Sequence, residues 1–140
     1  MRRNGVFGEE REDPEVEAPD EKIPEFTAAD WDGWAAEDME GGKEEARAWL
    51  KGEKNGIFEM GNAPVIKLTD DLYTAGAENV WITGIESFGG GQLSASMAVE
   101  LPGEAEMRGK VFAVDAKFRG MNGEGPAKDV GQNFLTYYFD

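Results

Sequence analysis

The run from Gln92 to Leu101 alternates between polar and apolar side chains, and it constrains the fold more tightly than any other stretch of the chain. Its apolar positions share one face of an extended backbone and are Leu93, Ala95, Met97, Val99 and Leu101. A period of two residues is that of a strand with one buried face, whereas a helix repeats every ~3.6 residues. Glycines at 89–91 precede the run and supply a turn. The pattern therefore predicts a half-buried strand of a β-hairpin.

Two other segments have apolar residues at helical spacing. The first has Asn62 as its candidate N-cap, Pro64 in its first turn and Gly76 at its end. Its apolar stripe consists of Val65, Leu68, Leu72 and Ala75. The stripe of the second segment consists of Met107, Val111, Val114 and Phe118. Such stripes predict two helices that each turn one face toward a core.

Short segments at 57–60, 80–88 and 133–139 are rich in strand-forming residues. Together with the hairpin strand and the two helices, they give the order β-α-β-β-α-β from Gly56 onward. This order resembles the ferredoxin-like plan, in which two helices cover one face of an antiparallel sheet. The expected fold class is therefore α+β, with a ferredoxin-like domain over residues 56–140. Because many unrelated functions use this plan, it indicates no activity.

Residues 27–55 are expected to form a helical extension. Thr27 is a candidate N-cap for a helix over 28–39, which would end at the glycines that follow. Trp31, Trp34 and Ala35 would lie on one side of this helix, and Asp32, Glu37 and Asp38 on the other side, in water. A second helix is predicted over 43–51, with an apolar stripe of Ala46, Trp49 and Leu50.

Apolar side chains occupy both faces of two predicted strands. At 80–88, Trp81 and Ile85 alternate with Val80 and Ile82, and the strand at 133–139 has the same character. Both faces of the sheet therefore require a cover. We favour the two helices of the extension, rather than a second subunit, as the cover of the second face.

The charge of the chain is concentrated near its beginning. The chain has 29 acidic and 14 basic residues and a formal charge of −15, of which −10 belongs to residues 1–40. The segment from Glu9 to Glu25 also contains three prolines and few apolar residues. A segment of this composition buries too little surface to offset the entropy of ordering it. We therefore predict a flexible acidic arm over residues 1–26.

The chain contains neither cysteine nor histidine. This excludes disulfides, thiolate nucleophiles, zinc sites built on Cys and His, and imidazole general bases. Gly103–Lys110 does not have the spacing of a phosphate-binding loop, and Asp30–Gly33 has its glycine too early for a calcium loop. We accordingly predict no metal and no cofactor.

Catalysis by carboxylates is the enzymatic alternative that the composition leaves open. Asp115 and Glu124 lie near a glycine-rich loop in which Lys128 and Asp129 could approach them. Exposed loop charges are usually only solvated. Ser94 and Ser96 have no base among their neighbours and are expected on a polar strand surface. We predict no catalytic residues and a protein that is not an enzyme.

The favoured function is a non-catalytic acidic module whose arm binds a basic surface on a protein partner, as inhibitors that imitate nucleic acid do. The candidate partner-binding residues are Glu9, Glu10, Glu12, Asp13, Glu15, Glu17, Asp20 and Glu21. One alternative is a structural subunit, or a homo-oligomer, whose arm reaches a neighbour. Another is a small-ligand sensor or a carboxylate-based enzyme. A third possibility for the arm is that it only increases solubility.

Direct binding to nucleic acid is not expected, because each phosphate would meet the negative charge of the chain. The aromatic and basic consensus of RNA-binding sheets is also missing from the predicted strands. The chain has no apolar run of about 18 residues and no apolar core of a secretory signal, so we expect neither a membrane partner nor export. The expected location is cytoplasmic.

Overall fold

The computed structural model describes residues 26–139. Its helices are α1 (Ala28–Glu40), α2 (Ala46–Leu50), α3 (Asn62–Ala75) and α4 (Ala105–Met121). Its strands are β1 (Lys43–Glu45), β2 (Asn55–Ile57), β3 (Asn79–Thr83), β4 (Glu86–Phe88), β5 (Gly91–Ser94), β6 (Ser96–Glu100) and β7 (Phe134–Tyr138).

The strands form two sheets. The larger sheet is antiparallel throughout and has the order β1-β3-β6-β7. The smaller sheet has the order β2-β5-β4, with β2 parallel to β5. The chain passes between the sheets at Gly84, which has a φ of 57°, and again at Ala95. These elements confirm the predicted α+β class.

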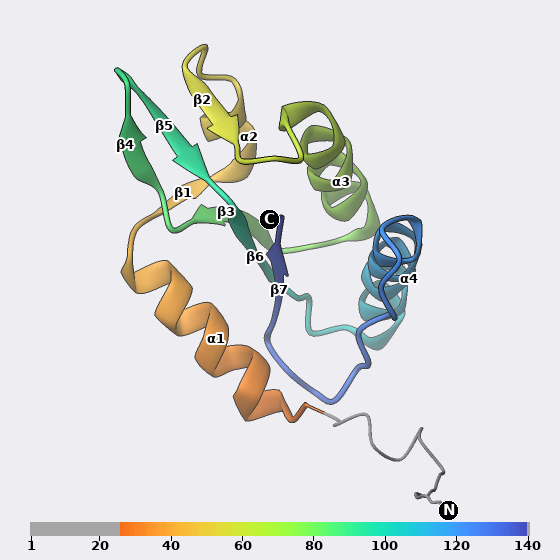
Figure 1. The fold of residues 1–140 in the computed structure, drawn as a ribbon. Helices are drawn as coiled ribbons and strands as arrows, with labels where there is room; N and C mark the ends of the chain where they lie inside the picture. The colour runs from red at the N-terminus through yellow and green to blue at the C-terminus, as the bar shows by residue number, and fades with distance from the viewer. Residues whose placement is uncertain (1–25, 140) are drawn as a thin grey trace, which may run out of the picture.

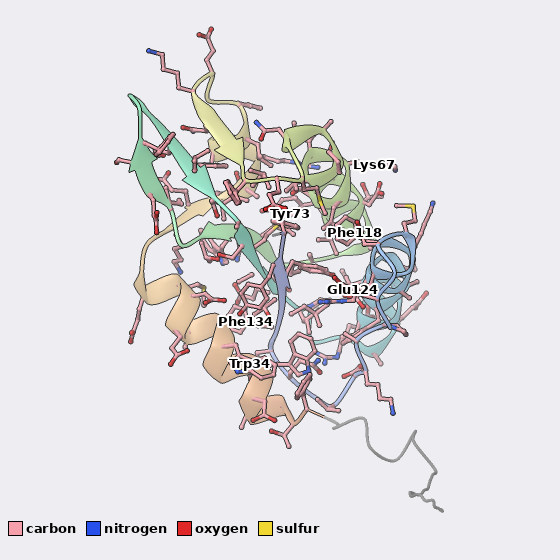
Figure 2. The ribbon with its side chains drawn as sticks, viewed as in Figure 1. Trp34, Lys67, Tyr73, Phe118, Glu124 and Phe134 are labelled. Atoms are coloured by element: carbon pink, nitrogen blue, oxygen red, sulfur yellow. The ribbon has the colours of Figure 1, made fainter. Side chains whose placement is uncertain are left out.

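The larger sheet lies between two helical layers. Figure 1 shows α1 on one side of this sheet and α3 with α4 on the other. Figure 2 shows Trp34 and Phe134 on the α1 side and Phe118 near α4. The core residues contributed by the sheet toward α3 and α4 are Val80, Ile82, Met97, Val99, Leu135 and Tyr137. On the second face of β6, which α1 covers, Ala98 is also buried.

The ferredoxin-like arrangement is not confirmed. In that plan the first strand of residues 56–140 would lie inside the main sheet, but β6 pairs directly with β7. The predicted strand at 57–60 is instead β2, which is only three residues long and pairs with β5. The N-cap of α3 is Gly61, and the prediction of Asn62 at this position is wrong. The Asn62 side chain accepts from the N–H of Ile57 (2.8 Å) and donates to the carbonyl of Asn55 (2.9 Å), so it holds β2 against α3.

The predicted helix over 28–39 is confirmed as α1, with Thr27 as its N-cap. The predicted helix over 43–51 is correct only in its second half. Residues 43–45 form β1 on the edge of the larger sheet, and α2 begins at Ala46. The change occurs at Glu45, whose carboxylate caps α2 by accepting from the N–H of Ala48 (2.8 Å). Ala46, Trp49 and Leu50 are buried, as predicted.

The predicted hairpin is confirmed at its turn but not in the length of its second strand. Gly89 and Gly90 both have positive φ, as a two-residue turn between β4 and β5 requires. The run from Gln92 to Leu101 is divided at Ala95 into β5 and β6, which belong to different sheets. Polar and apolar residues alternate across Ala95 just as they do on either side of it. The sequence pattern therefore does not reveal that the strand is divided at this residue.

The stop of α3 is confirmed at Gly76. This residue has a φ of 120°, and its N–H donates to the carbonyls of Leu72 and Tyr73. A Cβ atom at this position would lie 2.7 Å from the terminal methyl carbon of Met107, at the packing contact between α3 and α4. Gly76 is therefore required both by backbone conformation and by the space available.

We expect Gly76→Ala to lower the free energy of unfolding by about 1–3 kcal/mol, because the alanine would be strained and would displace Met107. Gly109→Ala makes the same chemical change in the middle of α4, where a Cβ would meet no atom within 4 Å. It should raise stability by roughly 0.5–1 kcal/mol through helix propensity. Urea denaturation measures both values, and changes of the same sign would contradict this account.

Candidate functional site

The arm proposed from the sequence lies outside the described residues. This applies to all eight candidate partner-binding acids: Glu9, Glu10, Glu12, Asp13, Glu15, Glu17, Asp20 and Glu21. The described part of the chain begins at Phe26, immediately before α1. The surroundings of this junction are therefore the part of the predicted site that the structure can describe.

The entry into α1 is fixed by a capping box and an aromatic contact. The Thr27 hydroxyl accepts from the N–H of Asp30 (3.1 Å), and the Asp30 carboxylate accepts from the N–H of Thr27 (2.9 Å). Phe26 packs against Trp31 with ring centroids 6.2 Å apart, as in a hydrophobic staple. Asp30 therefore serves as a cap.

The sequence analysis placed Asp32 and Asp38 of α1 in water, and this prediction is wrong. Both carboxylates bind β7 or the residue directly before it. Asp32 accepts from the backbone N–H groups of Asn133 (2.9 Å) and Phe134 (3.1 Å) and from the Asn133 amide (3.1 Å). Asp38 accepts from the hydroxyl of Tyr138 (2.7 Å). Partial burial and this hydrogen bond raise the pKa of Tyr138 to about 12. Asp32 thus attaches α1 to the beginning of β7, and Asp38 attaches it to the end of that strand.

A buried ion pair lies on the opposite side of β7. Asp115 of α4 is fully buried. One of its oxygens accepts from Arg119 Nε (2.6 Å) and from the hydroxyl of Tyr137 (2.6 Å), and the other accepts from the N–H of Ala127 (2.9 Å). A buried carboxylate needs such donors, because an unpaired charge in the interior is costly.

Arg119 extends this cluster across the edge of β7. Its Nη2 donates to the carbonyl of Thr136 (2.8 Å), and its guanidinium carbon lies 4.3 Å from the ring centroid of Tyr137 and 5.7 Å from that of Trp31. Burial is the largest influence on the pKa of Arg119 and acts to lower it, but the charges of Asp115, Tyr137 and Glu124 and the hydrogen bond to Asp115 together outweigh burial, and the pKa is raised. Burial, followed by the charge of Asp115, raises the pKa of Tyr137 well above its usual value. The arginine is therefore charged and the phenol protonated.

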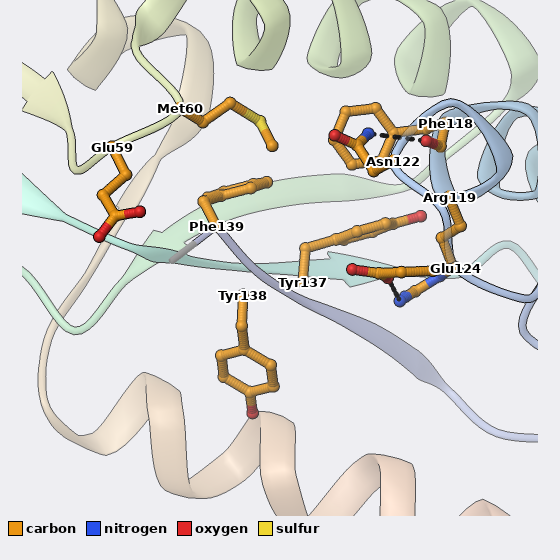
Figure 3. A pocket seen from close by; sticks show the side chains of 9 residues that line it. All are labelled: Glu59, Met60, Phe118, Arg119, Asn122, Glu124, Tyr137, Tyr138 and Phe139. Atoms are coloured by element: carbon orange, nitrogen blue, oxygen red, sulfur yellow. Dashed lines mark hydrogen bonds and ion pairs between the residues drawn. The ribbon is translucent and has the colours of Figure 1, made fainter.

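The cluster forms one wall of a pocket of about 270 Å³ (Figure 3). Its lining residues are Glu59, Met60, Phe118, Arg119, Asn122, Glu124, Tyr137, Tyr138 and Phe139. The Tyr137 and Phe139 rings are parallel within 8°, and the Phe118 ring is nearly perpendicular to both. In Figure 3 the Tyr138 ring points away from these three rings, toward α1.

The chemistry available in this pocket is limited by bonds already made within the protein. Tyr137 and Asp115 bind each other through the atoms that would exchange a proton with a substrate. Arg119 uses Nε and Nη2 on the protein itself. The charged residues that line the pocket are Glu59, Glu124 and Arg119, and the arginine is already paired with Asp115 and Glu124.

The glycine-rich loop brings together only part of the group considered from the sequence. Glu124 lies 3.5 Å from Arg119 Nη1 and so is linked to Asp115 through that arginine. Asp129 instead forms two hydrogen bonds with Arg108 (2.6 and 3.1 Å), and the first cause of its lowered pKa is this contact. The two acidic residues of this loop therefore bind different arginines, Glu124 binding Arg119 and Asp129 binding Arg108.

Ser94 and Ser96 do not lie on an open polar surface, which corrects the prediction made for them. Ser94 is buried and donates to the carbonyl of Thr83 (2.5 Å), and the Ser96 and Thr83 hydroxyls are 2.8 Å apart. These contacts hold the start of β6 against the end of β3, where the chain changes sheets.

Sequence reasoning did not identify Arg119 and Tyr137 as partners of Asp115. A signal was present, because Asp115 lies four residues after Val111 and three before Phe118, on the apolar stripe of its helix. An acid on a buried stripe with an arginine four residues later indicates an internal ion pair.

Within residues 26–139 no group of three or more acidic side chains has the arrangement of a metal site. No helix in this same part of the chain is long and apolar enough to cross a membrane. Comparisons of the sequence with protein-family models and curated proteins, and of the chain with solved structures, found no match. The function must therefore be argued from the residues themselves.

We expect Asp115→Asn to lower the free energy of unfolding by about 3–5 kcal/mol, because Arg119 would lose its charged partner while remaining largely buried. The matched control is Asp70→Asn, which removes a carboxylate from an ion pair with Arg47 that is about half exposed on both sides. The control should cost less than about 1 kcal/mol. Urea denaturation compares the two, and equal losses would contradict a structural role for Asp115.

The ionisation of the three tyrosines gives a second test. The pKa of each is raised, chiefly by burial. The shifts are large for Tyr137 and Tyr138, so absorbance at 295 nm should show at most one tyrosine of the folded protein ionising near pH 10, the usual value. Stability should fall as the pH rises above about 10, because tyrosines of the unfolded chain ionise there, whereas Tyr137 and Tyr138 of the folded protein stay protonated to higher pH. Transitions of two or more tyrosines near pH 10, with the circular dichroism unchanged, would refute the burial of Tyr137 and Tyr138 described here.

Proposed function

We propose that this protein is a non-catalytic acidic binding module whose N-terminal arm, residues 1–26, engages a basic surface on a protein partner. The observation that carries the proposal is the composition of α1, the helix that follows the arm. It contains five carboxylates and no basic side chain. The acidic character of the arm therefore continues onto an ordered element.

The five carboxylates of α1 have two different roles. Asp30, Asp32 and Asp38 make the cap and the attachments to β7 described above. Glu37 and Glu40 are exposed. The first three hold the helix in place, and the other two add to the negative potential beside the arm. Such a potential accelerates encounter with a basic surface over about a Debye length, ~8 Å at physiological salt.

The fixed entry into α1 supports the same proposal. Phe26 is held against Trp31 and Trp34, and Thr27 is held by the capping box. The exposed carboxylates of α1 therefore have a fixed position beside the point where the arm joins the helix, which favours joint action of arm and helix on one partner. The expectation of a cytoplasmic location is part of this proposal and comes from the sequence alone.

A synthetic peptide rich in Lys and Arg can represent the basic surface. In the arm variant, four glutamates become glutamine: Glu9, Glu10, Glu12 and Glu15. In the control variant, four exposed glutamates elsewhere become glutamine: Glu53, Glu78, Glu86 and Glu104. Both variants change the net charge equally. The arm variant should bind the peptide about tenfold more weakly than the unaltered chain, and the control less than about threefold.

Isothermal titration at low and high salt measures these affinities, and the difference between the variants should disappear near 1 M salt, where the Debye length is about 3 Å. Equal weakening in both variants would indicate a general effect of net charge and would refute a specific role of the arm. A chain beginning at Ile23 that binds with unchanged affinity would refute it as well.

The alternative of a structural subunit, with an arm that reaches a neighbouring copy, makes a different prediction. Sedimentation should then give a mass above the 15.3 kDa of one chain. Deletion of the arm should return the mass to that of the monomer. An unaltered chain that sediments as a monomer at all concentrations would refute this alternative.

A further inference from the structure

A second pocket, of about 380 Å³, lies between α2 and α3, on the α3 side of the larger sheet. Its lining residues are Arg47, Leu50, Lys51, Ile66, Thr69 and Asp70. Its volume falls in the range of about 300–1,000 Å³ that is typical of small-molecule sites. The pocket is separate from α1 and from the buried Asp115 cluster.

The floor of this pocket is apolar. Leu50 and Thr69 are buried in the packing between α2 and α3, with Thr69 only 1% exposed. Ile66 is 41% exposed and, within residues 26–139, is not among the apolar side chains that pack against the core. An exposed β-branched side chain beside a buried leucine offers apolar surface to a ligand.

Two cations lie at the rim. Arg47 and Lys51 are four residues apart at the two ends of α2. The Arg47 guanidinium carbon lies 4.6 Å from the ring centroid of Tyr73, and its Nε donates to Asp70 (3.0 Å). Among the described residues, neither Nη atom of Arg47 donates a hydrogen bond and Lys51 has no ion pair. The donors that suit a carboxylate are therefore available at this rim.

The arrangement also selects the number of charges on a ligand. Asp70 and the stacking on Tyr73 orient the guanidinium before a ligand arrives, which reduces the entropy lost on binding. Two cations, Arg47 and Lys51, and the Asp70 carboxylate give the rim a net charge of +1, which one negative group neutralises and a second would exceed. An anion with one head group and an apolar body satisfies both the floor and the rim.

We propose that the pocket between α2 and α3 binds a small molecule with an apolar body and a single carboxylate. The carboxylate accepts from the Nη atoms of Arg47 and from Lys51, and the apolar body covers Leu50 and Ile66. This site acts independently of the acidic surface, so either proposal can fail without the other.

Octanoate is the probe for this proposal, measured by isothermal titration with the full chain. We expect binding with a Kd of about 1 mM, since a small, partly exposed ligand gains little more than its association costs. Acetate, which has the head group without the body, should bind at least about tenfold more weakly. Octylammonium, which has the body with the opposite charge, should also bind more weakly at this rim.

The residues are tested by Arg47→Gln and Lys51→Gln, each of which should weaken octanoate binding about threefold. The matched control is Lys67→Gln, an exposed cation on α3 that pairs with Asp71 and does not line the pocket. It should leave the affinity unchanged. All three side chains are exposed, so the variants should fold, and circular dichroism verifies this.

Three results would overturn the assignment. The first is the absence of saturable octanoate binding below about 20 mM, well above the expected Kd. The second is equal weakening by Lys67→Gln, which would show a general effect of charge. The third is octylammonium binding as tightly as octanoate, which would show that the rim cations contribute nothing to recognition.

Discussion

The carboxylate of Asp115 joins three consecutive segments of the chain: a helix, the loop that follows it and the last strand. It accepts from Arg119 one turn later in α4, from Tyr137 in β7, and from the backbone of Ala127 in the loop between them. Because an uncompensated charge in the interior costs several kcal/mol, none of these donors can leave without destabilising the rest. Helix α4, its following loop and the last strand are therefore held as one unit. The aromatic pocket beside them depends on that unit.

The sequence was sufficient where one local signal determined the structure. Gly76 ends α3 because its backbone conformation suits glycine, and Thr27 starts α1 because its hydroxyl caps the helix. The sequence was insufficient where pairing with a distant strand determined the secondary structure. Residues 43–45 have the composition of a helix but pair with β3, and the strand near Ile57 pairs with β5 in a separate sheet. Local propensity does not encode which distant strand a segment meets.

The same limit applied to the charged residues. The sequence indicated where acids are numerous, but it could not separate those that bind the fold from those that face the solvent. Asp32 and Asp38 were expected in water and instead attach α1 to β7, whereas Glu37 on the same helix remains exposed. Asp32 and Asp38 each accept from a donor about 100 residues away, and the spacing of residues within the helix does not reveal such a donor. Part of the acidity of this chain is therefore structural.

The attachments of α1 and α4 have a further consequence for β7, which is an edge strand. The N–H of Phe134 donates to Asp32, and the carbonyl of Thr136 accepts from Arg119, so two backbone groups on the open side of the strand are occupied. Edge strands with free groups are templates on which chains aggregate. Here side chains from the two helical layers block that template. A partner at this side of the molecule must therefore bind through surface side chains, without extending the sheet.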